Sequence, residues 1–154
     1  MFYCVTLTSE QLNALNVMFR YKMIVAVHYD IQEAITKADG KPEALTLLNT
    51  VVSTLDTIEH LKQALTVWVF QASNSPLGAV QCTVNPIMRE HFLTILQGNY
   101  SPHPDIGETT KQMLYDVTAI QPTILKIFEE AEMIDVFGNK TSVLTSTTKP
   151  DMMN

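Results

Sequence analysis

The chain has 154 residues with 46% apolar and only 17% charged side chains, and its formal net charge is −6. This length is enough for one ordinary domain. No cluster of lysine and arginine is present to neutralise phosphates, so we expect neither nucleic-acid binding nor attachment to an anionic membrane. Because the charged fraction is low, either Thr, Ser, Asn and Gln supply much of the polar surface or another subunit covers part of it.

Membrane and secretory segments are not predicted. No stretch approaches the roughly 20 apolar residues that a membrane-spanning helix needs, and the first residues lack a basic region followed by an apolar core. Cys4 and Cys82 are the only two cysteines, and we expect reduced, buried thiols rather than a disulfide. These features predict a cytoplasmic protein.

The N-terminal quarter is predicted to form a short strand and then a long helix. Residues 2–7 alternate and are rich in aromatic and β-branched side chains, which is typical of a strand. Thr8 lies three residues before Gln11, the spacing of a capping box. A helix should therefore begin at Ser9 and continue to about Lys37.

This first helix carries apolar residues on two nearly opposite faces. One stripe follows the whole helix and consists of Val17, Tyr21, Ile24, His28, Ile31 and Ile35. The other covers only the first half and ends at Ala26. A helix that is apolar on both sides lies in a core or in an interface between subunits. Since a short bundle has few helices to cover both stripes, we predict a self-association surface formed by Leu12, Leu15, Phe19 and Met23.

A second long helix is predicted over residues 44–72. Before it, Gly40 is suited to a helix end and Pro42 to a first helical turn. Its apolar stripe is interrupted by Lys62, and its opposite face is rich in Thr and Ser. Two long helices joined by a short turn predict an antiparallel helical hairpin.

The next segments are shorter. Residues 77–84 are either an extended connector or a short strand. Asn85 and Pro86 form a cap followed by a first-turn proline, so a helix should extend from there to Leu96. Residues 99–105 are predicted to be a loop.

The C-terminal part begins with a helix starting near Gly107. Pro122 falls inside it and should either kink or split the helix. Apolar runs at 134–137 and 141–144 then flank Gly138-Asn139, a plausible hairpin turn.

Together these elements predict a mainly α fold, a helical bundle built on the long antiparallel hairpin. The N-terminal strand and the C-terminal hairpin should add a small β element at one end. Residues 1–148 are predicted to form a single domain, and residues 149–154 a flexible tail.

Candidate chemical sites are few. Asp56 and His60 share a helix face, but that face is polar, so we expect a solvated pair and no bound metal. His28 is either a core or interface histidine with a satisfied hydrogen bond, or a protonation switch.

The most site-like cluster is in the proline-bearing loop, where His103 and Asp105 are followed by Glu108. Asp105 could equally be the N-cap of the next helix. A hydrolase would need this cluster to converge with another histidine. No nucleophile, dinucleotide or phosphate-loop motif is present, and glycine occurs only five times. We therefore expect neither an enzyme nor a cofactor.

The sequence favours a non-enzymatic protein–protein interaction module that forms a homo-oligomer and binds another protein. Adaptors, assembly factors and small inhibitors of host or viral origin fit this description. The alternative is a helical bundle that binds an apolar small molecule or, as a weaker alternative, a metal. Its interior would be lined by Phe19, Tyr21, Met23, Trp68 and Phe70.

Overall fold

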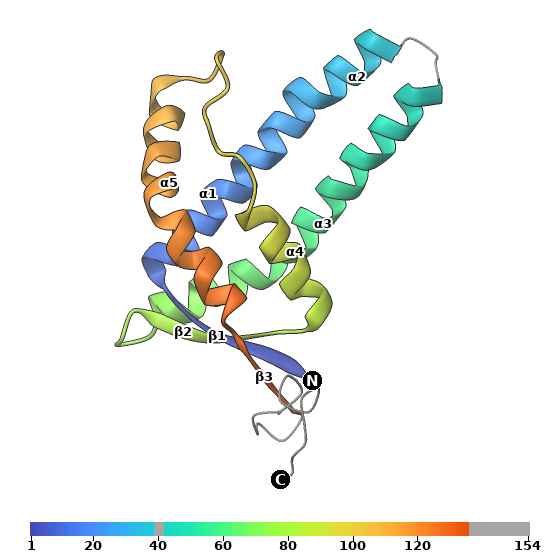
Figure 1. The fold of residues 1–154 in the computed structure, drawn as a ribbon. Coiled ribbons are helices and arrows are strands. Elements are labelled where there is room, and N and C mark those ends of the chain that lie inside the picture. The colour runs from blue at the N-terminus through green and yellow to red at the C-terminus, as the bar shows by residue number, and fades with distance from the viewer. Residues whose placement is uncertain (39–41, 136–154) are drawn as a thin grey trace.

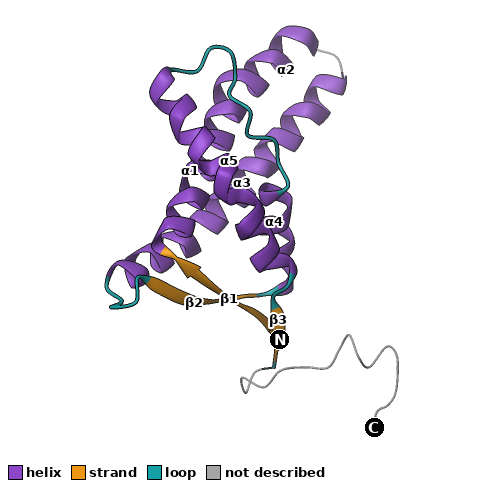
Figure 2. Cartoon of the chain, turned by 60° about the vertical axis from the view of Figure 1, so that its left-hand side comes forward, coloured by secondary structure: helices purple, strands orange, loops and turns teal. Residues whose placement is uncertain are grey.

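The computed structural model describes residues 1–38 and 42–135, which form a mainly helical chain with a small antiparallel sheet at one end (Figures 1 and 2). This confirms a mainly α fold with a small β element, although residues 79–84, which were not expected in the sheet, pair with the N-terminal strand. The elements in chain order are β1 (Phe2–Thr8), α1 (Ser9–Val25), the π-helical turn η1 (Ala26–Asp30), α2 (Ile31–Ala38), α3 (Pro42–Ser73), β2 (Ala79–Val84), α4 (Pro86–Leu96), α5 (Glu108–Glu129) and β3 (Glu132–Ile134). The predicted C-terminal hairpin turn, the tail and the Gly40 turn lie outside the described residues.

The sheet has the strand order β2-β1-β3, with both neighbours antiparallel to β1. Its β2 strand settles the open interpretation of residues 77–84 in favour of a strand. The helices lie on one side of the sheet (Figure 2). Val5 and Leu7 of β1 are buried in the same core as Cys82 and Val84 of β2, so the sheet closes one end of the helical core.

Local capping signals determine where two of the helices begin. The Thr8 hydroxyl accepts a hydrogen bond from the Gln11 amide at 3.2 Å, and the Gln11 side-chain oxygen accepts one from the Thr8 amide at 3.0 Å. Asn85 caps α4 by accepting from the Met88 amide at 2.8 Å. Both predicted helix starts are confirmed. The helices begin there because each cap satisfies amides that lack a partner within the helix.

Pro122 does not split its helix. α5 continues from Glu108 to Glu129 and changes direction near its middle (Figure 1). A proline inside a helix removes one backbone hydrogen bond and bends the axis. The N-cap of α5 is Gly107, so the interpretation of Asp105 as this cap is wrong.

The core contains a cluster of four aromatic rings, each from a different helix. Phe92 of α4 is fully buried, and its ring centroid lies 4.8 Å from that of Phe128, 5.7 Å from Trp68 and 5.9 Å from Phe19. These separations are typical of favourable aromatic pairs. The cluster therefore joins α1, α3, α4 and α5 at one point.

Beyond this core, α2 and the first part of α3 extend side by side away from the sheet (Figure 1). We call residues 24–38 and 42–54 the arm. Several of its large apolar side chains remain exposed: Ile24, Val27, Ile35, Leu45, Leu47 and Val52. The arm therefore offers apolar surface that the rest of the described chain does not cover.

Candidate functional site

The structure overturns the predicted self-association surface. Leu12, Leu15 and Phe19 have no exposed area and belong to the core of the single chain. Met23 is half-buried, with its sulfur 4.0 Å from Nζ of Lys62 on α3. The prediction was wrong because the remaining helices and the sheet cover this side of α1, so a partner cannot reach it in the folded chain.

His28 lies on η1 and its side chain is exposed. The interpretation as a core histidine is therefore wrong, whereas the interpretation as an interface histidine stays a prediction. The protonation switch stays a prediction, because it requires a partner to cover the apolar residues around His28. The other predicted pair, Asp56 and His60, is about three-quarters exposed, with the two side chains 3.9 Å apart.

The loop cluster anchors the chain to α1 and η1. The His103 ring stacks on Tyr29 with centroids 3.7 Å apart, and its Nδ1 accepts a hydrogen bond from the Asp105 amide at 3.2 Å. The Tyr21 hydroxyl accepts from the His103 amide at 2.8 Å and donates to the Ser101 carbonyl at 3.0 Å. These contacts give His103 and Asp105 a structural explanation.

Glu108 is directed to a different partner, since its carboxylate lies 3.5 Å from Nζ of Lys111. His60 pairs with Asp56 on α3, and His103 contacts Tyr29. Within residues 1–38 and 42–135, no three His, Cys, Asp or Glu side chains gather closely enough to hold a metal ion.

Three of the four aromatic residues predicted to enclose a ligand, Phe19, Tyr21 and Trp68, instead pack against other rings. The rings of Phe19 and Trp68 both contact the ring of Phe92. The ring centroid of Tyr21 lies 6.4 Å from that of Tyr100. Phe70 is 70% exposed and does not belong to the interior. The proposed ligand-binding interior is therefore filled by the protein's own side chains.

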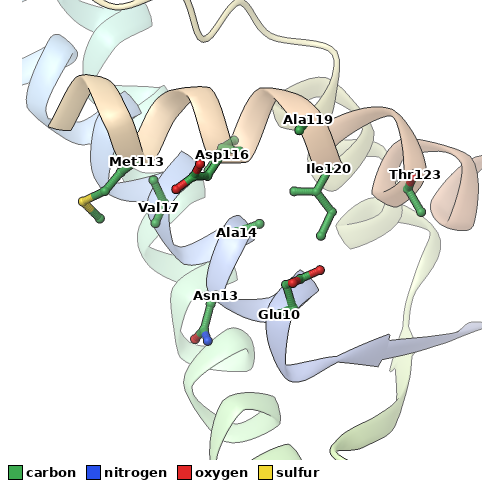
Figure 3. A pocket seen from close by; sticks show the side chains of 10 residues that line it. Glu10, Asn13, Ala14, Val17, Met113, Asp116, Ala119, Ile120 and Thr123 are labelled. Carbon is green, nitrogen blue, oxygen red and sulfur yellow. The ribbon is translucent and has the colours of Figure 1, made fainter. Parts of the chain in front are cut away.

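A groove of about 670 Å³ lies between α1 and α5 (Figure 3). It extends over about three helical turns of α5, from Met113 to Thr123. From α1 it is lined by Glu10, Asn13, Ala14 and Val17. From α5 it is lined by Met113, Asp116, Val117, Ala119, Ile120 and Thr123.

The periodicity of both helices explains this groove. Residues at positions i, i+3, i+4 and i+7 share one face of a helix, and Glu10, Asn13, Ala14 and Val17 follow this spacing. Their neighbours Leu12 and Leu15 point into the core instead. Ala14 and Ala119 are short, so the helices leave a hollow whose floor is apolar and whose rim is polar (Figure 3).

Two exposed carboxylates, one on each helix, belong to the groove lining (Figure 3). Asp116 accepts a hydrogen bond of 3.3 Å from the Gln112 side chain on the same helix. In the part of the chain that the structure describes, no cation lies within ion-pair distance of Glu10 or Asp116. No lysine or arginine lines the groove. The groove is thus an apolar surface with a negative rim.

The two cysteines are free thiols in different surroundings. Cys82 is 1% exposed, and burial, with a smaller contribution from nearby Cys4, raises the pKa of its thiol to about 12. Cys4 is half-buried, and its sulfur lies 2.9 Å from Nε2 of Gln81.

We expect a disulfide reagent at pH 8 to modify Cys4 quickly and Cys82 slowly, since the thiolate is the reactive form and a raised pKa leaves less of it. Both thiols should react quickly in urea. The absorbance change during reaction of the wild type and of Cys4→Ser with the disulfide reagent measures the two rates. Rapid reaction of Cys82 in folded Cys4→Ser would contradict its burial.

Comparisons with known proteins do not place the chain in a family: no family model, no curated protein and no solved structure matches it. In residues 1–38 and 42–135, no helix is both long and apolar enough to span a bilayer.

Proposed function

We propose that this chain is a non-enzymatic protein-interaction module that forms a homo-oligomer and binds a second protein as an adaptor, assembly factor or small inhibitor. The observation that carries this proposal is the exposed apolar stripe on the arm. Ile24, Val27 and Ile35 are 37%, 42% and 55% exposed, with the half-buried Ile31 between them. In this proposal the long antiparallel hairpin holds the stripe away from the core.

A second copy of the chain is the occupant that suits this stripe. The row of residues 24, 27, 28, 31 and 35 contains no carboxylate, so two copies can meet there although the whole chain carries a net charge of −6. In a twofold dimer the same surface contacts itself. Pairing two such stripes removes the apolar side chains of both copies from water, which favours association.

Light scattering during size-exclusion chromatography tests this self-association. At micromolar concentration we expect the wild type to have the mass of a dimer. The double variant Val27→Glu/Ile35→Glu should have the mass of a monomer, because it places charges inside the apolar contact. Circular dichroism should show unchanged helix content, since both positions are exposed.

Ile87→Glu is the matched control. Ile87 lies on α4 and is 70% exposed, so a charge there should leave the dimer intact. A monomeric wild type at all accessible concentrations would remove the oligomeric part of the proposal. Dissociation by Ile87→Glu as well would place the contact elsewhere.

A further inference from the structure

We infer that the groove between α1 and α5 binds an amphipathic helix of a partner protein, with lysine or arginine beside the apolar face of that helix. This inference names the second partner of the proposed interaction module and therefore rests on that proposal. It does not depend on self-association through the arm.

The dimensions of the groove suit a short helix. From Met113 to Thr123 the α5 wall rises by about 15 Å, at 1.5 Å per residue, which corresponds to about three turns of a bound helix. Ala14 and Ala119 leave the hollow that would admit large apolar side chains. A helix presents such side chains at positions i, i+3, i+4 and i+7.

The two helical walls of the groove are not suited to binding an extended peptide. Both walls are helices, whose backbone donors and acceptors are paired within each helix apart from the one hydrogen bond that Pro122 removes from α5. They therefore offer no free sheet edge to which a strand could add. An extended segment would lose water from its backbone groups without replacing those hydrogen bonds, whereas a helix pairs its backbone internally.

The charges of the groove lining indicate the sign of the charge on the partner. Glu10 and Asp116 are exposed, come from opposite walls and have no cationic partner among the described residues. A lysine or arginine beside the partner's apolar face would supply the missing cation. The net charge of −6 would attract the same partner during diffusion.

A second copy of this chain does not meet that requirement with its arm. The exposed arm stripe contains Ile24, Val27, Ile31 and Ile35 and has no lysine or arginine within it. The groove and the arm stripe thus differ in the chemistry they would recognise. We therefore assign the groove to a different, basic protein.

The test uses a fluorescent helical peptide of about 14 residues, with leucine at i, i+3, i+4 and i+7 and lysine at most other positions. Its acidic counterpart has glutamate in place of lysine. We expect anisotropy to show saturable binding of the basic peptide and no binding of the acidic one. Absence of saturable binding by the basic peptide would overturn the inference.

Charge-reversed variants place this binding on the molecule. Glu10→Lys/Asp116→Lys should lower the affinity for the basic peptide by about tenfold or more, because the charge on each side of the groove would repel the peptide instead of attracting it. Glu43→Lys/Glu59→Lys is the matched control, since it changes the net charge equally at exposed positions of α3. Equal weakening by both double variants would show only non-specific attraction to an acidic protein and would overturn the inference.

Filling the groove gives an independent test. Ala119→Trp should abolish peptide binding, whereas Thr109→Trp, an exposed position of α5 outside the groove lining, should not. Unchanged binding in folded Ala119→Trp would overturn the inference. A change of the dimer to a monomer in this variant would assign the groove to a second copy instead.

The variant Val27→Glu/Ile35→Glu separates the two proposals. If it becomes monomeric and still binds the basic peptide, the groove acts independently of self-association, as we expect. If the wild type proves monomeric but binds the peptide, only the oligomeric part of the proposed function fails. Loss of peptide binding in this variant would contradict a groove confined to α1 and α5.

Discussion

Replacing Phe92 with alanine is expected to lower the free energy of unfolding by about 3–5 kcal/mol, the range typical of a fully buried aromatic residue. Phe92 has no exposed area, and its ring contacts Phe19, Trp68 and Phe128. Its removal would leave a cavity between four helices that are held by other contacts and cannot close completely. Urea unfolding followed by circular dichroism measures the loss.

The fluorescence of Trp68 provides a local readout of the same change. Trp68 is the only tryptophan and stacks on Phe92, so its native emission should also shift in the variant. Ile87→Ala is the control on the same helix, and because Ile87 is 70% exposed its effect should stay within about 0.5 kcal/mol. A loss below about 1 kcal/mol for Phe92→Ala would contradict the central place of this ring.

The features that sequence analysis predicted correctly are encoded by residues close together in the chain. Thr8 and Gln11 lie three residues apart, and together they determine the start of α1. Asn85 and Pro86 determine the start of α4 in the same way. Such signals need no knowledge of the rest of the fold, because the atoms involved belong to one helical turn.

The errors concern contacts between distant parts of the chain. Phe19 is covered by Phe92, which follows it by more than 70 positions. The periodicity of α1 shows that two faces are apolar, but it does not show which later helix covers each face. The prediction that the chain lacks enough helices to cover both faces was wrong for Leu12, Leu15 and Phe19.

The groove between α1 and α5 also combines local features that the sequence shows with a long-range contact that it does not show. The helical spacing of Glu10, Ala14 and Val17 is visible in the sequence, as is the apolar side of α5. The sequence does not reveal that these two faces are neighbours. It also gives no sign that Glu10 and Asp116 belong to one surface, because charge complementarity becomes apparent only once the helices are paired.

The π-helical turn η1 could not be predicted from the helical periodicity of the sequence either. A π-helical turn contains an additional residue, so residues after Ala26–Asp30 no longer follow the angle assumed for a regular helix. This turn carries His28, which periodicity placed in an apolar seam and which the structure leaves exposed. Its next residue, Tyr29, receives the ring of His103.

Arg89→Met should lower the free energy of unfolding by about 2–3 kcal/mol, since it removes hydrogen bonds from a charged and largely buried donor. Nε of Arg89 donates to the Phe128 carbonyl at 3.1 Å, and Nη2 donates to the Glu129 carbonyl at 3.2 Å. Its guanidinium also lies 4.5 Å from the ring centroid of Tyr3. One side chain therefore joins α4, β1 and the C-terminal end of α5.

The expected loss arises mainly at that end of α5. The last carbonyls of a helix lack partners within the helix and carry partial negative charge, so a cation that binds them is stabilising. Arg89→Lys should restore only part of the stability, because an ammonium group cannot reproduce the two-pronged geometry of the guanidinium.

Arg20→Met is the matched control for charge, since Arg20 is the only other arginine and is exposed on α1. Urea unfolding of the three variants and hydrogen exchange of the β1 and β3 amides provide the measurements. Faster exchange in Arg89→Met, but not in Arg20→Met, would follow from loosening the junction of α5 with the sheet. Equal stability of these two methionine variants would contradict the role of Arg89, because only the general loss of one positive charge would then remain to explain the change.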